Sequence, residues 1–313
     1  MQILGKTGIE VSSLCFGSLT LSSFQANLPI KEGANLIQYG YEKGINFIDT
    51  AEIYENYEYI HHALKSISRD QLIIATKAYC YDKITAEKSF EKALKEIGTD
   101  YIDIFLLHEQ ESEYTLKGHR EALETLFKLK EKGFIRGVGI SSHFISCIEA
   151  TKKYKEIEII HPIININGIG IQDGSREDML NAIQKRHEDG IGVYSMKALG
   201  GGHLIQNNLN ALEWIKSIDF IDSTAIGMQS KEEIDYNTGL FFNNREDLQA
   251  KEYLREKKRR LIVADYCVGC GTCVERCKQK AIEIVNGQAY PNESCILCGY
   301  CATVCPEFCI KVI

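Results

Sequence analysis

The chain has 313 residues, of which 44% are hydrophobic and 25% are charged, and its formal net charge is −7. This balance is typical of a folded globular protein with a sizeable core, and the negative charge argues against a general nucleic-acid binder. No apolar stretch reaches the roughly 18 residues that a membrane-spanning helix needs, and the first residues do not resemble a signal peptide. We therefore expect a cytoplasmic protein that binds neither nucleic acid nor a membrane.

Short apolar segments alternate with longer amphipathic ones along most of the chain. The predicted strands are Val11–Ser18, Asn46–Ala51, Gln71–Ala78, Tyr101–Glu109, Ile135–His143, Glu158–Asn167, Ile191–Ala198 and Ser223–Met228. A helix-period stretch follows each strand, as in "TAEKSFEKALKEIG", where Phe90, Leu94 and Ile97 recur at helical spacing. Eight such units in about 250 residues predict an α/β fold, the (β/α)8 TIM barrel. A doubly wound open sheet is the alternative, but "CFGSLTLSS" lacks its G-x-G-x-x-G.

The segment Asn243–Leu261 is strongly charged and predicts a single connecting helix. Such a helix would lead the chain back toward the face of the barrel where active sites lie. Its basic run "REKKRR" (Arg255 to Arg260) is interpreted as a solvated helix end. The predicted domains are therefore a barrel at 1–241, a helical connector at 242–261 and a small α+β domain at 262–313.

Nine of the twelve cysteines lie in the last domain, between Cys267 and Cys309. "CVGCGTCVERCKQKAIEIV" aligns without gaps with "CILCGYCATVCPEFCIKVI", 28 residues later. Both copies carry C-x2-C-x2-C-x3-C, a spacing that suits an iron–sulfur cubane better than the separated C-x2-C pairs of zinc sites. Cys309 falls opposite Ala281, so we interpret it as a buried filler and not as a ligand.

Four polar residues stand at or just past predicted strand ends, where barrel enzymes place their catalytic groups: Asp49, Tyr54, Lys77 and His108. An ammonium beside a tyrosine lowers the pKa of the phenol, and a carboxylate holds the ammonium in place. An imidazole orients a carbonyl by hydrogen bonding to its oxygen. The four residues together predict a site that delivers a proton to a carbonyl while hydride arrives from a cofactor.

The motifs "GINFIDTAEIY", "IIATK", "YIDIFLLH", "IRGVGISSH" and "STAIGMQSKEEIDYN" resemble the aldo-keto reductase family in order and spacing. The resemblance covers about residues 1–240 and implies Tyr54 as proton donor, Lys77 and Asp49 as its tuning pair and His108 as substrate orienter. It also implies an NADP or NAD cofactor. The implied cofactor-binding positions are Gly17, Ser18, Ser141, Ser142, Gly200, Gly201, Gly227, Ser230, Glu233 and Asn237. Glu233 departs from the family, which often has an arginine there for the 2'-phosphate.

The cysteine-rich tail resembles the two-cluster bacterial ferredoxins over residues 262–313. In that family the fourth cysteine of each motif binds the other cluster. The resemblance therefore implies two [4Fe-4S] clusters with crossed ligand sets. One set is Cys267, Cys270, Cys273 and Cys305, and the other is Cys295, Cys298, Cys301 and Cys277.

Together the patterns predict an oxidoreductase of aldo-keto reductase type that transfers hydride between a nicotinamide cofactor and a small carbonyl or alcohol substrate. The fused cluster domain would exchange electrons with an external redox partner protein. Hydride carries two electrons and a cluster takes one, so direct coupling normally needs a go-between such as a flavin. No flavin fingerprint is visible, and a flavin is left open. The alternative is an electron-transfer protein in which the barrel is a scaffold, or an enzyme in which the clusters are structural.

Overall fold

The computed structural model describes residues 1–313. Eight parallel strands form a closed barrel in the order β10-β3-β4-β5-β6-β7-β8-β9, so the predicted (β/α)8 barrel is confirmed. All eight predicted strands are present, most of them shorter than expected. Their bounds are β3 (Leu14–Gly17), β4 (Phe47–Asp49), β5 (Ile73–Ala78), β6 (Ile102–Leu107), β7 (Ile135–Ser142), β8 (Ile159–Pro162), β9 (Gly192–Ser195) and β10 (Ser223–Gly227).

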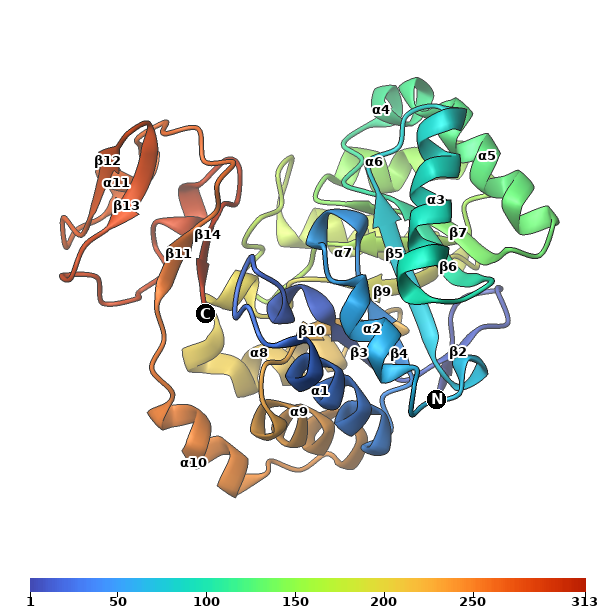
Figure 1. The fold of residues 1–313 in the computed structure, drawn as a ribbon. Helices are drawn as coiled ribbons and strands as arrows, with labels where there is room; N and C mark the ends of the chain where they lie inside the picture. The colour runs from blue at the N-terminus through green and yellow to red at the C-terminus, as the bar shows by residue number, and fades with distance from the viewer.

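Helices surround the barrel and bury one apolar face against the strands (Figure 1). They are α1 (Ile30–Glu42), α2 (Tyr57–Ala63), α3 (Lys83–Ile97), α4 (Glu113–Gly118), α5 (Arg120–Glu131), α6 (Ile145–Ala150), α7 (Arg176–Glu188), α8 (Asn208–Lys216) and α9 (Lys231–Asn243). The local sequence explains where they begin and end. At α3, the Asp82 carboxylate accepts from the Thr85 N–H at 2.8 Å, and Gly98 closes the helix with φ of 77°.

A short hairpin closes one end of the barrel. It consists of β1 (Gln2–Ile3) and β2 (Glu10–Val11), paired antiparallel. Leu4, Ile9 and Val11 pack onto apolar side chains inside the barrel, including Phe47. These three apolar side chains are buried and fill this end of the barrel interior. The opposite end, where the strands finish, is the end at which barrel enzymes bind ligands.

The connector differs from the single helix predicted over Asn243–Leu261. Helix α10 covers only Leu248–Glu256, nine residues. Asn244 closes α9 with φ of 51°, and the Asp247 carboxylate caps a new helix by accepting from the Ala250 N–H at 3.0 Å. These two capping residues interrupt a pattern that looks continuous in charge, and residues 257–260 run without helix or strand.

The last fifty or so residues form a small module in which the sequence repeat becomes a structural repeat. Strand β11 (Leu261–Val263) pairs with β14 (Ile310–Val312), and β12 (Ile282–Val285) pairs with β13 (Gln288–Pro291), both antiparallel. A shift of 28 residues carries β12 onto β14 and β11 onto β13. A short helical segment precedes one strand of each pair. Helix α11 (Thr272–Arg276) precedes β12, and the 3-10 turn η7 (Ala302–Val304) precedes β14.

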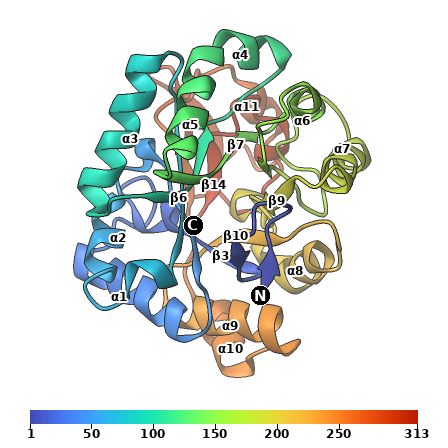
Figure 2. The same ribbon diagram turned by 90° about the vertical axis from the view of Figure 1, so that its right-hand side faces the viewer.

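The module lies at the end of the barrel away from the N-terminal hairpin. Figure 1 shows it beside the barrel with the N-terminus on the far side, and Figure 2 shows the N-terminus in front with the module behind. Strand β14 packs against η5 (Gly200–Gly202), the glycine run that follows β9. The cluster module therefore covers the face on which barrel enzymes carry their active sites.

Candidate active site

The predicted catalytic residues converge at the C-terminal face of the barrel. Asp49 ends β4, Lys77 is the penultimate residue of β5 and His108 follows β6. Because these neighbouring strands are parallel and in register, their ends meet at one edge. Tyr54 arrives from the 3-10 turn η2 (Glu52–Tyr54) that follows β4.

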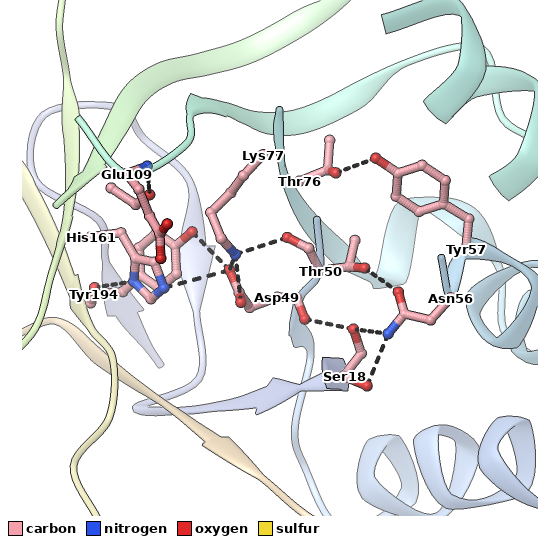
Figure 3. A network of polar contacts seen from close by, with 11 residues as sticks. Ser18, Asp49, Thr50, Asn56, Tyr57, Thr76, Lys77, Glu109, His161 and Tyr194 are labelled. Carbon is pink, nitrogen blue, oxygen red and sulfur yellow. Dashed lines mark hydrogen bonds and ion pairs between the residues drawn. The ribbon is translucent and has the colours of Figure 1, made fainter. Parts of the chain in front are cut away.

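Lys77 and Asp49 form a buried ion pair at the centre of the site (Figure 3). The Lys77 Nζ lies 2.7 Å from each carboxylate oxygen and 2.8 Å from the Thr50 carbonyl oxygen. The three ammonium hydrogens therefore all have acceptors. A buried pair with its donors satisfied is fixed in geometry, since breaking it would leave an uncompensated charge.

Two residues that the sequence analysis did not select complete the surroundings of Asp49. The Tyr194 hydroxyl donates to Asp49 Oδ2 at 3.0 Å, and the His161 ring stacks on Tyr194 with centroids 3.9 Å apart. His161 Nδ1 lies 2.6 Å from the Tyr194 carbonyl oxygen, which only accepts, so Nδ1 carries the proton. His161 lines the same cavity as Asp49 and is a candidate contact for a ligand.

A second group of hydrogen bonds holds the loop that carries Tyr54 (Figure 3). The Thr50 hydroxyl donates to Asn56 Oδ1 at 2.6 Å, and the Asn56 amide donates to the Ser18 carbonyl oxygen at 2.9 Å. The Ser18 hydroxyl in turn donates to the Asp49 carbonyl oxygen at 2.9 Å. All four residues are buried, so the loop bearing Tyr54 is anchored on both sides.

Tyr54 lines the cavity, but its electrostatics differ from the expectation. Burial first, and then the charges of Asp49 and Glu109, raise the pKa of the phenol well above its usual value. Lys77 lies 5.2 Å from the centre of the tyrosine ring, with its hydrogens directed at Asp49 and Thr50. The ammonium is engaged elsewhere, so Tyr54 keeps its proton at neutral pH.

His108 is also in the neutral state. Burial, followed by the Lys77 charge, lowers its pKa to about 3. Its ring packs edge-on to Tyr54 at 5.8 Å and stacks on Tyr79 at 4.5 Å. Its Nδ1 is buried without a hydrogen-bond partner in the protein, a costly arrangement that a polar ligand or an ordered water would relieve.

A cavity of about 210 Å³ opens beside Asp49 and Tyr54. Of the predicted cofactor positions, five line it: Gly17, Gly201, Gly227, Glu233 and Asn237. Ser230 instead caps α9 by accepting from the Glu233 N–H at 3.3 Å. The Ser141 hydroxyl accepts from the Glu109 N–H, and the Ser142 hydroxyl donates to the Gln110 carbonyl oxygen, so both hold backbone. Gly200 and Ser18 are buried behind the cavity wall.

The cluster module supplies part of this cavity wall. Phe308, Lys311, Val312 and Ile313 line the cavity together with the barrel residues. The Phe308 side chain is buried between the two domains, with the Lys197 Nζ 4.5 Å from its ring centre. A Cβ on Gly202 would overlap the Val312 carbonyl oxygen. The glycine run thus allows β14 to approach as closely as it does.

Two further contacts fix the module on the barrel. The His203 Nε2–H donates to the Ile310 carbonyl oxygen at 2.9 Å. Gly299, inside the second cysteine motif, lies against the His203 ring, so that a Cβ there would come within 2.9 Å of Nδ1. None of these contacts was predicted, because they join segments about a hundred residues apart without any local signal.

The cysteines of the first predicted cluster site are gathered around one hollow. It is lined by Cys267, Cys270, Cys273 and Cys305, together with Cys309. Burial and then the sulfurs of Cys305, Cys267 and Cys270 raise the pKa of the Cys273 thiol, so the thiols repel one another's charge. Metal ions would relieve this repulsion. The donor set therefore fits an iron–sulfur cluster.

Fewer contacts describe the cysteines of the second predicted cluster site. Cys295 and Cys298 lie close enough to Cys301 to act on its thiol, while Cys277 accepts a 3.3 Å hydrogen bond from the Ala281 N–H. Cys309 is buried, as expected of a filler, and its sulfur lies 3.4 Å from that of Cys305.

The model of the aldo/keto reductase family matches residues 13–217, about two thirds of the chain. The chain belongs to the aldo/keto reductase family. A second model, that of a 4Fe-4S binding domain, matches residues 261–283 and covers the first cysteine motif.

Curated relatives are distant. The chain is 29% identical over 214 residues to a probable aldo-keto reductase of Glycine max, covering 64% of this chain and 59% of the relative. It is also 29% identical over 187 residues to methylglyoxal reductase DkgA of Yersinia pestis, covering 58% of this chain and 64% of that protein. The chain thus spans about three fifths of the length of these relatives.

Solved structures show the same fold. An aldo-keto reductase from Bacillus halodurans in its holo form superposes with a TM-score of 0.65 at 22% identity, covering 81% of this chain and 94% of that one. The uncovered part corresponds in size to the cluster module. No helix of the protein has the length and apolar character needed to cross a membrane.

Proposed function

We propose that the barrel transfers hydride between a nicotinamide cofactor, NADP or NAD, and a small carbonyl or alcohol substrate. The observation that carries the proposal is the protonated Tyr54 phenol in the wall of a cavity that also holds Asp49 and the glycines expected at the cofactor. The cofactor would lie along Gly17, Gly201, Gly227 and Asn237. The three glycines carry no side chain and so allow close approach of a ligand.

The residues divide the work of carbonyl reduction between them. Tyr54 holds a proton at its hydroxyl oxygen and donates it to the oxygen that develops negative charge. Neutral His108 donates a hydrogen bond to the same oxygen and so orients it. Asp49 holds the Lys77 ammonium 5.2 Å from the centre of the Tyr54 ring. A bound nicotinamide would supply the hydride, and bound clusters would supply electrons singly.

The high pKa of Tyr54 favours one direction of the reaction. A phenol that keeps its proton serves as an acid toward an alkoxide, whereas oxidation of an alcohol needs a base. We therefore propose that the barrel works chiefly as a carbonyl reductase. Since one relative is named a methylglyoxal reductase, methylglyoxal and other small aldehydes are the first substrates to test.

The cysteine module, residues 262–313, is proposed to hold two [4Fe-4S] clusters. Cys267, Cys270, Cys273 and Cys305 would bind the first, and Cys295, Cys298, Cys301 and Cys277 would bind the second. A gapless repeat in which four cysteines of one copy match four of the other supports this assignment. The clusters would exchange electrons with an external ferredoxin-like redox partner.

A second candidate function is electron delivery from the first cluster into the cavity. Phe308 follows the ligand Cys305 by three residues and lines the cavity beside Lys311. One side chain thus separates the cysteine loop from the substrate space. Reduction of a carbonyl by this route would take two electrons, one at a time, from a reduced ferredoxin-type donor, and two protons.

Protein purified and assayed without oxygen separates these functions. Tyr54→Phe should lower aldehyde reduction with NADPH or NADH by at least about 100-fold, the scale of general acid catalysis, while the cluster absorbance stays unchanged. The matched control is Tyr81→Phe, an exposed tyrosine that should leave turnover unaltered. Unchanged turnover in Tyr54→Phe would contradict the assigned site.

The role of the clusters needs a separate measurement. NADPH or NADH is added in the absence of flavin, and the cluster absorbance and EPR signal are followed. Bleaching of the clusters supports coupling and contradicts a purely structural role. Normal aldehyde reduction by a variant in which Cys267 and Cys295 are both serine would contradict obligatory coupling. If neither the parent protein nor any variant reduces an aldehyde, the result would favour the alternative in which the barrel is a scaffold.

A further inference from the structure

The basic run of the connector is not a solvated helix end. Helix α10 stops at Glu256, and the following residues pass along the cavity before β11 begins. Arg259 lines the cavity together with Gln229 and with Glu233 and Asn237, two of the predicted cofactor-binding positions. The neighbouring Arg260 is exposed, and its backbone pairs with that of Ile313. The two arginines therefore have different surroundings.

The Glu233 carboxylate has its own partners within the protein. Its Oε2 accepts from the Gln229 N–H at 2.7 Å, and its Oε1 lies 2.8 Å from the Lys257 Nζ. Lys257 also contacts the Gln229 side-chain oxygen at 3.2 Å. The carboxylate is thus held against the start of α9 and paired with a cation. The repulsion of a 2'-phosphate that the sequence suggested for Glu233 is largely cancelled by Lys257.

Arg259, in contrast, has no hydrogen-bond or ion-pair partner among the protein side chains, although it is partly buried. Its pKa is lowered by burial, and only the Glu233 charge acts in the opposite direction. Removing a guanidinium from water without a partner costs free energy that a bound anion would return. The N-terminus of α9, a helix of thirteen residues capped by Ser230, adds positive potential at the same place.

We propose that Arg259 binds the 2'-phosphate of NADP, with Lys257 acting as a positioning residue that pairs with the Glu233 carboxylate. This inference rests on the proposed use of a nicotinamide dinucleotide. A phosphate dianion suits the site because a guanidinium offers two parallel N–H donors to its oxygens. Specificity for the cofactor is thus supplied by the connector to the cluster module, outside the part of the chain that matches the barrel family.

Binding of adenosine 2',5'-bisphosphate and adenosine 5'-monophosphate, measured by calorimetry on the cluster-loaded protein, tests the inference without any turnover. The parent protein should bind the bisphosphate at least about tenfold more tightly, the effect of one charge-assisted hydrogen-bonded contact. Arg259→Gln should remove this preference and leave the monophosphate affinity unchanged. Arg260→Gln is the matched control and should keep the preference.

Two further measurements sharpen the test. Lys257→Met should lower affinity for the bisphosphate only, because it leaves the negative charge of the Glu233 carboxylate without its cationic partner. The additional change Glu233→Gln should recover that affinity. The preference should also weaken below about pH 6, where the phosphate loses one charge. Unchanged cluster absorbance in each variant shows that the fold is retained.

Different negative results of the binding experiment would contradict different parts of the proposal. Equal loss of both ligands in Arg259→Gln would place the arginine at the 5'-phosphate, and no loss of either would remove it from the site. A parent protein that binds the monophosphate and NAD without preferring a 2'-phosphate would overturn this inference alone. A parent protein that binds none of the adenosine ligands would overturn the proposed dinucleotide function as well.

Discussion

The two copies of the cysteine repeat have similar backbone conformations but different surroundings. Lys280 and Phe308, at equivalent positions, have φ of 51° and 49°, and Gly271 and Gly299 have φ of 83° and 78°. Yet Lys280 is exposed, whereas Phe308 is buried against the barrel. Likewise Ile284 is 40% exposed and its counterpart Val312 only 6%. The same small fold therefore occurs twice, once facing solvent and once forming part of the wall of the cavity beside Asp49 and Tyr54.

The difference shows that docking depends on residues that differ in surroundings between the two copies and not on the cysteine spacing, which the copies share. Both copies place cysteines at the same spacing. Only the second presents a large ring to Lys197 and a bare backbone to Gly202. Substitutions at matched positions of the two copies should therefore have unequal effects.

The largest inequality is expected between Phe308→Ala and Lys280→Ala. Removing a buried phenylalanine ring costs about 3–5 kcal/mol, whereas an exposed lysine in a loop contributes within about 0.5 kcal/mol. Hydrogen exchange should rise in Gly200–Gly202 and in β14 for the Phe308 variant only. Equal exchange in the two variants would show that the module is held by other contacts.

A smaller inequality is expected between Gly299→Ala and Gly271→Ala. Both positions have left-handed φ, so each alanine costs about 1–2 kcal/mol. The alanine at Gly299 also meets the His203 ring, while the one at Gly271 has nothing within 4 Å. The melting temperature of the Gly299 variant should be lower by a few degrees, on the order of 2–4 °C per kcal/mol. Identical melting temperatures would argue against close packing on His203.

The smallest effect is a pH dependence of stability at Lys197, the barrel residue that contacts the Phe308 ring. Burial, opposed by Glu109 and aided by Lys311 and Lys77, lowers the pKa of Lys197 to about 7. The unfolded chain keeps this proton until about pH 10.4, so between pH 7 and 10 it binds more protons than the folded state. The contribution of Lys197 to the free energy of unfolding therefore rises with pH in this window.

Denaturant unfolding at pH 7 and pH 9, followed by the fluorescence of the single Trp214, measures this contribution. Lys197→Met should reduce the rise in the free energy of unfolding between pH 7 and pH 9. The reduction should be well under the limit of about 1.4 kcal/mol per pH unit, because the Lys197 side chain is partly exposed and solvent screens its charge. The exposed Lys258 provides the control. A slope that is the same in both variants would mean that Lys197 stays protonated throughout.

The sequence predicted the barrel well because its signals are local. Apolar runs bounded by helical periodicity found all eight strands. Asp49, Lys77 and His108 were selected because they end or follow such runs, and the structure brings them to one edge of the barrel. His161 and Tyr194 were missed, since each lies within an apolar stretch and looks like ordinary core. Their polar role depends on Asp49, which is more than a hundred residues away in the chain.

Features that depend on two domains meeting were not predictable in this way. The charged pattern of the connector continues through Asp247, so one helix was expected where a cap begins a shorter one. Arg259 was grouped with its exposed neighbours because sequence does not show which of several adjacent cations faces a cavity. The pKa of Tyr54 was expected to fall. It rises because the phenol is buried and because the charges of Asp49 and Glu109 lie near it.

The pairing of β11 with β14 has a consequence for the order of assembly during synthesis. Strand β14 leaves the ribosome after every strand of the barrel, and domains tend to fold in the order in which they emerge. The barrel is therefore complete while its cavity still lacks the wall formed by Phe308 and Val312. Until β14 pairs with β11, the cavity of a nascent chain would stay open on this side.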